Sequence, residues 1–172
     1  MRPGSESIGS AAYIAVIGST VATDQQARIA EAVGAEIAHA GAVLVCGGLG
    51  GVMEAACKGA KSAGGTTLGI LPGHDRRDAN KFVDLIVATG IGESRNAVIV
   101  ATADGLIAVG GEYGTLSEIA LGLRAGKPVV GLATWELKRP TGDAFADSGA
   151  EGIVTASDPH DAVQTVLRLT GS

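Results

Sequence analysis

Two glycine-rich loops carry the residues of this sequence whose types and spacing could bind an anion. One contains GGLGG at residues 47–51, and the other contains GGEYGT at residues 110–115. Each lies between a short β-branched run and a helical pattern. Glycine lets the backbone come close to a ligand, and the N–H groups at a helix start favour an anion such as phosphate. Tight strand-to-helix turns use glycine even without a ligand, so it is the pair of loops that predicts an anionic ligand.

Polar side chains beside these loops extend the candidate site. Thr115 could donate its hydroxyl to a phosphate, or could instead cap the helix that follows. Ser19 follows Gly18 at the end of an earlier run and could contact the same ligand, although turns also favour serine. Cys46 ends a strand beside the first loop, where a small buried side chain is the simpler interpretation. No Cys or His pair has metal-ligand spacing, so we expect no bound metal.

Three standard motifs fail when they are tested. The dinucleotide fingerprint needs glycine at position 53, where this chain has Met53. Residues 122–128 (GLRAGKP) have the Gly-Lys pair of a P-loop but one residue too few, with Pro128 where Ser or Thr would bind Mg²⁺. Residues 92–96 (GESRN) lack the second glycine of a nucleophile elbow. These failures argue against an NAD site, a P-loop and a serine hydrolase.

The elements that must position the loops follow the pattern of a parallel α/β sheet. Short β-branched runs alternate with longer helical patterns, which is typical of βαβ units. The expected strands are residues 13–17, 43–46, 67–71, 85–87, 106–109, 129–132 and 153–155. The expected helices are residues 24–40, 52–63, 116–125 and 161–169, the last with Asp158 as its N-cap and Pro159 in its first turn. Most strands stop at a glycine, so the loops should meet at the carboxyl edge, where open α/β sheets bind ligands.

One segment permits two interpretations. Residues 96–101 are β-branched, and Asp104-Gly105 before the next apolar run is a hairpin signal. A parallel sheet instead needs a crossover before the run at residue 106, and residues 92–103 are long enough for a buried helix of three turns. We therefore predict a helix there. The polar segment 135–152 is expected to form a long surface loop.

Composition narrows the class of protein further. The chain has 172 residues, 46% of them apolar, with 27 glycines but only one Trp, two Tyr and two Phe. This length favours one domain. A net charge of −5 without a concentrated basic stretch argues against a nucleic-acid partner. Two cysteines outside any disulfide pattern indicate a reducing cytoplasm, and no apolar run is long enough to span a membrane.

Three segments resemble a known family: GGLGGVMEAACKGA at residues 47–60, GESRNAVIVATAD at 92–104 and VGGEYGTLSEIALGLRAGKPVVGL at 109–132. They look like the Lonely Guy proteins, once described as possible lysine decarboxylases, which share a Rossmann-like fold with DNA-processing protein A. The resemblance covers roughly residues 12–133, and GG-x-x-GT-x-x-E is its most specific part. It implies a three-layer Rossmann-like sandwich, with a mostly parallel sheet of about six or seven strands and helices on both faces. We expect that domain at residues 11–172, after a flexible arm at residues 1–10.

The resemblance implies two alternative functions. Lonely Guy enzymes cleave cytokinin nucleoside 5′-monophosphates to the free base and ribose 5-phosphate, and their motif has proline before the two glycines. Val109 stands at that place here. GGEYGTLSE together with SRN is more similar to the branch that includes the molybdenum cofactor carrier proteins, which bind that cofactor without a known reaction. This departure favours a binding protein.

For the enzyme alternative, the resemblance gives Arg95 and Glu118 the catalytic positions. Arg95 would hold the phosphosugar or purine side, and Glu118 would stabilise oxocarbenium charge or activate a water. Simpler interpretations stay open, because Thr115-Leu-Ser-Glu118 is also a capping box and Arg95 could be a solvated or ion-paired residue. A cation at a helix start, where the dipole disfavours it, nevertheless points to an anionic partner. Nothing in the chain marks a pyridoxal-phosphate lysine, so lysine decarboxylation is not expected.

The sequence thus predicts a binding or carrier protein for a phosphate-containing small molecule, either molybdenum cofactor or a nucleotide. The alternative is a nucleoside 5′-monophosphate phosphoribohydrolase. The candidate ligand-binding residues are Gly18, Ser19, Gly47, Gly48, Gly50, Gly51, Arg95, Gly110, Gly111, Tyr113, Gly114, Thr115 and Glu118. Tyr113 is the aromatic residue best placed to stack on a ligand ring. Helix faces rich in Ala and Gly, together with the family, favour a homodimer or homotetramer.

Overall fold

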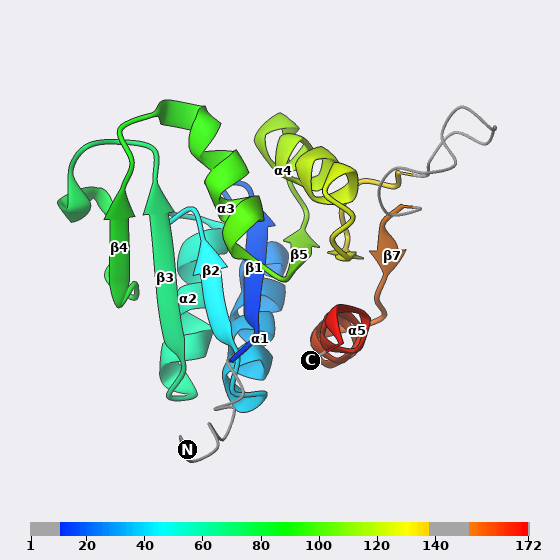
Figure 1. The fold of residues 1–172 in the computed structure, drawn as a ribbon. Helices are drawn as coiled ribbons and strands as arrows, with labels where there is room; N and C mark the ends of the chain where they lie inside the picture. Colours follow the sequence, from blue (N-terminus) through cyan, green and yellow to red (C-terminus); the bar gives the residue numbers. More distant parts are fainter. Residues whose placement is uncertain (1–10, 138–151, 172) are drawn as a thin grey trace, which may run out of the picture.

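The short apolar runs of the sequence form seven parallel strands of one sheet in the part of the chain that the structure describes (Figure 1). This structure is a computed structural model, and it describes residues 11–137 and 152–171. The strands are β1 (Tyr13–Gly18), β2 (Val43–Cys46), β3 (Thr66–Leu71), β4 (Leu85–Ala88), β5 (Gly105–Val109), β6 (Val129–Leu132) and β7 (Val154–Thr155). The predicted fold class, an α/β sandwich with a parallel sheet, is confirmed.

The order of the strands creates a switch point at the centre of the sheet. The sheet runs β4-β3-β2-β1-β5-β6-β7. The chain moves outward from β1 to β4, then returns to the opposite side of β1 with β5. β1 and β5 pair in parallel, with Gly18 opposite Val109 at their carboxyl ends. Loops that leave adjacent strands in opposite directions at such a point leave a crevice between them, which is where open α/β sheets bind ligands.

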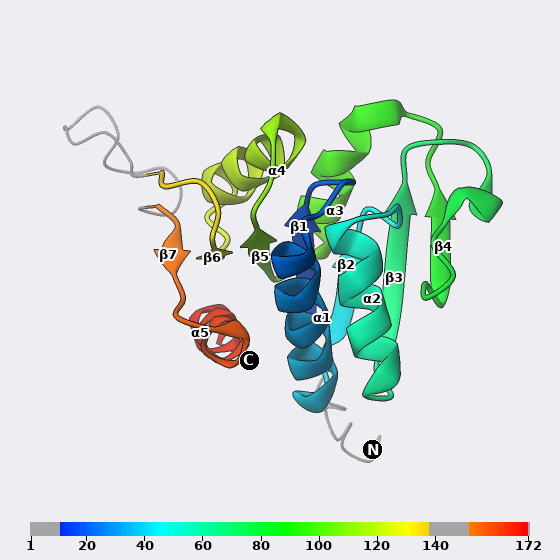
Figure 2. The same cartoon turned by 180° about the vertical axis from the view of Figure 1, so that it is seen from behind.

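Helices cover both faces of the sheet. The helices are α1 (Asp24–His39), α2 (Val52–Ser62), α3 (Asn96–Thr102), α4 (Tyr113–Arg124) and α5 (Pro159–Thr170), with short 3₁₀ turns η1 (Arg76–Asp78) and η2 (Gly92–Arg95). One apolar cluster joins α1, α2 and α5 to the sheet, and a second joins α3 and α4 to its other face. Figures 1 and 2 show these two layers from opposite sides. Asp158 caps α5 and Pro159 opens it, as predicted.

Residues 92–102 form the predicted helical crossover, as η2 followed by α3, but it is buried on one side only, since Ala97, Val98 and Ala101 are exposed. The hairpin alternative is wrong, because β5 pairs in parallel with β1. The carbonyl end of α3 is held by Lys127 from the loop before β6. The Nζ of this lysine donates hydrogen bonds to the carbonyl oxygens of Val100 at 2.6 Å, Ala101 at 3.0 Å and Ala103. A cation at a helix carboxyl end also complements the helix dipole.

Helix α4 begins earlier than the sequence suggested. We expected residues 116–125 with Thr115 as the cap, but α4 runs from Tyr113 to Arg124 and its N-cap, Glu112, makes no side-chain capping bond. Thr115 therefore lies inside the first turn, and the capping-box interpretation of Glu118 is wrong. A capping box does occur in α1, between Thr23 and Gln26.

Glycines allow α1 and α2 to pack backbone against backbone. A Cβ on Gly34 would lie 1.9 Å from the carbonyl oxygen of Ala56, and one on Gly59 would lie 1.8 Å from that of Glu31. Neither contact is possible for a larger residue unless the helices separate. Part of the glycine excess therefore serves helix packing, a role the sequence pattern did not indicate.

Two expectations concern segments largely outside the described residues. The flexible arm at residues 1–10 and most of the surface loop at 135–152 fall there. Across residues 11–137 and 152–171, no helix is long and apolar enough to cross a membrane.

The contact between α1 and α2 gives a stability prediction. Gly59→Ala should lower the free energy of unfolding by about 1–3 kcal/mol, because the new methyl group overlaps the Glu31 carbonyl and the backbones must move apart. Gly114→Ala in α4 is the matched control, since nothing lies within 4 Å of a Cβ there. Urea unfolding followed by circular dichroism would measure both. Equal stability of the two variants would contradict the packing role.

Candidate functional site

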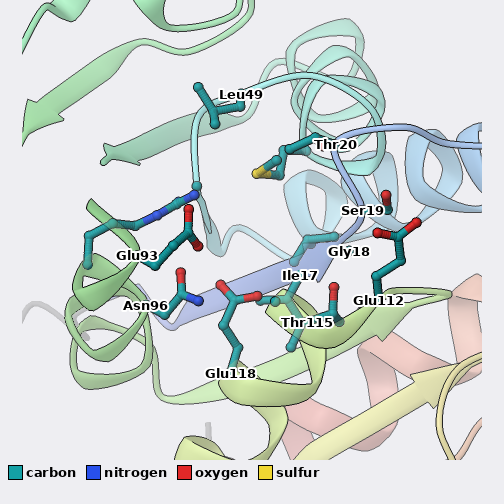
Figure 3. Close-up of a pocket in the computed structure, with 15 residues that line it drawn as sticks. Ile17, Gly18, Ser19, Thr20, Leu49, Glu93, Asn96, Glu112, Thr115 and Glu118 are labelled. Atoms are coloured by element: carbon teal, nitrogen blue, oxygen red, sulfur yellow. The ribbon is translucent and has the colours of Figure 1, made fainter. Parts of the chain in front are cut away.

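A cavity of about 200 Å³ lies at the carboxyl ends of β1 and β2, between the first turns of α2 and α4 (Figure 3). Its position is the switch point expected from the strand order. Its walls come from the end of β1, the first glycine loop, η2 with the start of α3, and the start of α4. The lining residues are Val16, Ile17, Gly18, Ser19, Thr20, Gly47, Leu49, Met53, Glu93, Arg95, Asn96, Glu112, Gly114, Thr115 and Glu118.

The structure brings seven of the thirteen candidate residues together around this cavity. These are Gly18, Ser19, Gly47, Arg95, Gly114, Thr115 and Glu118. The other six lie in the same two loops without lining the cavity: Gly48, Gly50, Gly51, Gly110, Gly111 and Tyr113. Segments far apart in the sequence therefore line one cavity.

Arg95 is the cation of this site and is almost completely buried. Its side chain is 5% exposed, and one terminal nitrogen donates a hydrogen bond of 2.9 Å to the carbonyl oxygen of Ile70. The guanidinium lies against Gly47, where a Cβ would be 2.0 Å from a terminal nitrogen. Its Nε is buried and has no partner among the described residues. A buried charge without its full set of partners is costly, so this donor makes Arg95 the strongest candidate in the cavity for a contact with a ligand.

Glu118 faces the same cavity from α4. It is 8% exposed, and Figure 3 shows its carboxyl group pointing into the cavity. Burial raises the pKa of Glu118 to about 8; the Arg95 charge opposes that shift, while the Glu93 charge adds to it. Burial is the largest of these effects, so the carboxyl is protonated at neutral pH. Glu118 is then a neutral hydrogen-bond donor facing the cavity.

Two further carboxylates stand at the cavity without an ion pair. Glu93 precedes Arg95 in η2, and Glu112 is the N-cap of α4. Both side chains are exposed and form no ion pair within residues 11–137 and 152–171. Asn96 links the two sides, since its Nδ2 donates a 3.0 Å hydrogen bond to Ser117 Oγ on α4. The start of α3 is thereby fixed to the start of α4.

Packing within the chain explains most of the loop glycines. A Cβ on Gly18 would lie 2.5 Å from Val52, and one on Gly110 would lie 2.1 Å from Gln26, at a φ of 55°. Gly48, Gly51 and Gly111 likewise combine positive φ with close neighbours. Gly114 differs, because no atom lies within 4 Å of a Cβ there and it borders the cavity.

Tyr113 lies next to the cavity but not in its wall. Its side chain is 82% exposed, and its ring packs against Trp135, with ring centroids 6.1 Å apart. The pair stands beside the first turn of α4. An aromatic surface is thus available near the cavity, on the outside.

Cys46 and Cys57 form a buried thiol pair behind the first glycine loop. Their sulfur atoms are 3.4 Å apart, and the Gly48 N–H donates to Cys46 Sγ at 3.3 Å. The hydrogen bond from Cys57 lowers the pKa of Cys46, whereas that same interaction raises the pKa of Cys57. Neither thiol lines the cavity, which agrees with the interpretation of Cys46 as a small buried side chain.

Sequence reasoning missed several lining residues: Thr20, Leu49, Met53, Glu93, Asn96 and Glu112. Glu93 and Asn96 flank Arg95 in GESRN, and Glu112 is inside GGEYGT, so position within a motif could have indicated them. Leu49 is inside GGLGG in the same way, whereas Thr20 and Met53 carry no such signal. The structure groups no three Cys, His, Asp or Glu residues at a potential metal site in its described ranges.

The fold and the cavity together define a Rossmann-like α/β protein with a cavity at the switch point of its sheet. Residues 11–163 match the model of the SLOG cluster4 family, and the chain belongs to that family. An uncharacterised protein of Archaeoglobus fulgidus is 52% identical over 120 residues, which cover 69% of this chain and 78% of the relative.

Solved structures with the same fold include molybdenum cofactor proteins. The molybdenum cofactor binding protein from Rippkaea orientalis is 35% identical, with a TM-score of 0.79 over 92% of this chain and 96% of that one. The Moco carrier protein from Chlamydomonas reinhardtii is 36% identical, with a TM-score of 0.77 over 94% and 98%. The expected relation to the molybdenum cofactor carrier branch is confirmed.

A more distant neighbour shares the fold alone. DNA processing protein A from Streptococcus pneumoniae is 18% identical, with a TM-score of 0.67 over 90% of this chain and 61% of that chain. The Rossmann-like fold inferred from the motifs is thus confirmed.

Glu118 gives a pH prediction. Its carboxyl group keeps its proton to about pH 8 in the folded protein but releases it near pH 4.5 when unfolded. The folded state binds more protons between these values, so the free energy of unfolding should fall as pH rises from about 4.5 to about 8.

The effect should amount to a few kcal/mol, since one pKa unit corresponds to about 1.4 kcal/mol. Urea unfolding of the native protein and of Glu118→Gln across this range would measure it, with the exposed Glu136→Gln as control. Only Glu118→Gln should flatten the profile. A profile that is the same in all three proteins would show that Glu118 ionises normally.

Proposed function

We propose that this protein is a carrier that binds molybdenum cofactor through its phosphate. The observation that carries the proposal is the buried Arg95, whose Nε lacks a partner at a cavity beside the start of α4. The names of the Rippkaea and Chlamydomonas proteins support the identity of the cargo, because each matches more than nine tenths of this chain.

The first turn of α4 supplies the donors for the phosphate. The first N–H groups of a helix have no partner within it, and the N-cap Glu112 makes no capping bond that would occupy them. Tyr113, Gly114 and Thr115 occupy this turn, and the positive end of the helix dipole adds to their effect. A phosphate between these N–H groups and Arg95 would satisfy both sets of donors. The open space at Gly114 is the place where it would approach the backbone.

Protonation of Glu118 makes the cavity compatible with an anion. An ionised Glu118 beside Glu93 would repel phosphate, whereas a neutral carboxyl group can donate a hydrogen bond to it. The raised pKa of Glu118, about 8, favours the neutral form at pH 7. Affinity for phosphate should therefore weaken as the pH rises above 8.

Cavity size supports a ligand that is held at one end. Small-molecule pockets commonly measure about 300–1,000 Å³, and this cavity has about 200 Å³. A cavity of this volume can hold a phosphate group together with the few ligand atoms bonded to that phosphate. The ring system of the cargo would lie outside, where Tyr113 and Trp135 offer an aromatic surface.

Retention of the cofactor tests the proposal. The purified chain should retain molybdenum cofactor through gel filtration, measured by oxidising the bound fraction to its fluorescent pterin and by native mass spectrometry. Arg95→Gln should reduce retention at least about tenfold, because it removes the charged hydrogen bonds. Gly114→Ala should do the same by filling the space for the phosphate without disturbing the fold.

Arg28→Gln, on the exposed side of α1, is the control for Arg95→Gln and should bind normally. Circular dichroism separates lost binding from lost folding. Failure of the native chain to retain the cofactor, or full retention by Gly114→Ala, would overturn the carrier proposal.

Cleavage of a nucleoside 5′-monophosphate is the second candidate function, favoured by the placement of Glu118 near Arg95 in one cavity. With a pKa of about 8, Glu118 would act at neutral pH as an acid that protonates the leaving base, while water forms the new bond at C1′. Above pH 8 it would instead serve as the base that activates water.

Chromatographic detection of free base from AMP tests this second function. The reaction should fall about 100-fold or more in Glu118→Gln, which lacks the acid, and remain unchanged in Glu136→Gln. The pH dependence of the rate shows which role Glu118 has. If Glu118 is the general acid, the rate should fall above pH 8; if it is the general base, the rate should rise there. No base release at high protein concentration, or an unchanged rate in Glu118→Gln, would exclude the reaction.

A further inference from the structure

The two cysteines of this chain, Cys46 and Cys57, are in contact in the folded protein. Cys46 ends β2 and Cys57 lies in α2, so they stand on either side of the first glycine loop. Their sulfur atoms are 3.4 Å apart, and both side chains are completely buried. Other small apolar side chains would fill this space equally well. The contact between two thiols therefore permits a reaction that packing alone does not require.

The pair has too few neighbours of the right kind to hold a metal ion. A structural zinc ion takes four ligands, usually cysteine and histidine. Within residues 11–137 and 152–171, no three Cys, His, Asp or Glu side chains are grouped so that they could hold a metal ion. Oxidation to a disulfide is the reaction that two thiols in contact can undergo without a further ligand.

The surroundings of the two sulfur atoms make them chemically different. The hydrogen bond between the thiols lowers the pKa of Cys46, and burial opposes that shift. The Gly48 N–H, which donates to Cys46 Sγ at 3.3 Å, and the charge of Arg95 lower this pKa further. The same thiol–thiol hydrogen bond, together with burial, raises the pKa of Cys57. Cys46 is therefore the thiol that ionises, and a thiolate is the form that attacks an oxidant.

We propose that Cys46 and Cys57 are a site of reversible oxidation, at which hydrogen peroxide joins them in a disulfide across the first glycine loop. The Cys46 thiolate attacks one peroxide oxygen, the O–O bond breaks, and the departing hydroxide takes up the proton that Cys46 released. Cys57 then attacks the sulfur of the Cys46 sulfenic acid, the S–O bond breaks, and the second hydroxide leaves with the Cys57 proton. Two electrons pass from the thiols to the peroxide, which ends as two water molecules.

Only a small movement separates the thiol pair from the disulfide. Bonded sulfur atoms are about 2.0 Å apart, so these two must approach by about 1.4 Å. Strand β2 is paired with β1 on one side and β3 on the other, which holds Cys46 in place. Cys57 belongs to a helix on the face of the sheet. Rotation of the two side chains, with a slight shift of α2, supplies the movement.

The disulfide would tie together the two ends of the first glycine loop, residues 47–51. One side of this loop is already held by Asn80. The Nδ2 of Asn80 donates a 2.9 Å hydrogen bond to the Leu49 carbonyl oxygen, and its backbone N–H donates one of 2.8 Å to that of Gly48. A covalent bond between residues 46 and 57 closes a short ring and restricts the unfolded chain. The oxidised protein should therefore resist unfolding better than the reduced protein does.

Burial restricts the oxidants that can reach the pair. Hydrogen peroxide is small and uncharged, whereas glutathione disulfide is large and charged and would need the loop to open. The path for a small molecule is short, because Gly47, the residue after Cys46, lines the cavity. Hydrogen peroxide should therefore oxidise the pair under conditions in which glutathione disulfide leaves it reduced.

Mass spectrometry of the native protein treated with hydrogen peroxide tests the site. The intact chain should lose two hydrogen atoms, and dithiothreitol should restore them. Trypsin leaves both cysteines in one peptide, residues 29–58, and this peptide should escape alkylation only after oxidation. Met53 lines the cavity and reports separately on the entry of peroxide, because its sulfoxide adds one oxygen atom. The urea midpoint should be about 1 M higher for the oxidised protein than for the reduced one.

Two variants test the order of the steps. In Cys57→Ser, the sulfenic acid at Cys46 has no thiol to react with, so dimedone should trap it. In Cys46→Ser, burial keeps the remaining thiol protonated, and dimedone should label it at least about tenfold more slowly. Circular dichroism confirms that each variant is folded, and the corresponding alanine variants replace any that is not.

Oxidation of Met53 while both cysteines still react with the alkylating reagent would overturn the proposal, because peroxide would then reach the cavity without joining the thiols. A pair that stays reduced in millimolar peroxide, a disulfide between two chains, or a sulfinic acid in place of the disulfide would overturn it as well. None of these measurements involves a ligand. The oxidation site can therefore fail while the phosphate site stands, and the reverse also holds.

Discussion

The buried guanidinium of Arg95 is the interaction on which the site depends. It joins three parts of the fold, since it donates to the Ile70 carbonyl at the end of β3, lies against Gly47 after β2 and starts from η2. Its charge also opposes the effect of burial on Glu118 in α4. A charge held this far from water needs partners for all its donors, yet Nε has none in the described chain. In the proposed phosphate site, one ligand would satisfy both this donor and the first N–H groups of α4.

The sequence was most informative where local pattern and topology agree. The alternation of strands and helices, the helical crossover at residues 92–103 and the single edge of glycine loops all follow from periodicity and the rules of parallel sheets. Arg95 and Glu118 came from a motif, and the structure places both at the cavity. The predicted start of α4 was wrong because Thr115 and Glu118 match a capping box, while the helix begins three residues earlier, at Tyr113. Local pattern cannot tell a cap from a residue in the first turn when both positions hold suitable side chains.

Other features depend on distances between elements, which no spacing in the sequence encodes. In the sequence, nothing distinguishes Gly34 and Gly59 from other residues of a helix. Their role is visible only in the structure, where the backbones of α1 and α2 are in contact at these two positions. Most loop glycines serve close packing or positive φ, so their number overstated the evidence for a ligand, whereas Gly114 borders the cavity with open space at its Cβ position. Tyr113 lies outside the cavity, and its ring contacts that of Trp135, a residue far from it in the sequence. These are tertiary effects.

Lys127 shows how a residue remote from the cavity enters its geometry. Helix α3 has only seven residues, too few to be stable by itself, and it has no glycine at its carboxyl end. The ammonium of Lys127 holds that end through three carbonyl oxygens, while the hydrogen bond from Asn96 to Ser117 holds the other. Arg95 is thus positioned by a short helix that is held at both ends by hydrogen bonds. The lysine at one of these ends belongs to the segment leading into β6. Residues 95 and 127 should consequently vary together among related chains, because replacing Lys127 would change the direction in which the Arg95 guanidinium points.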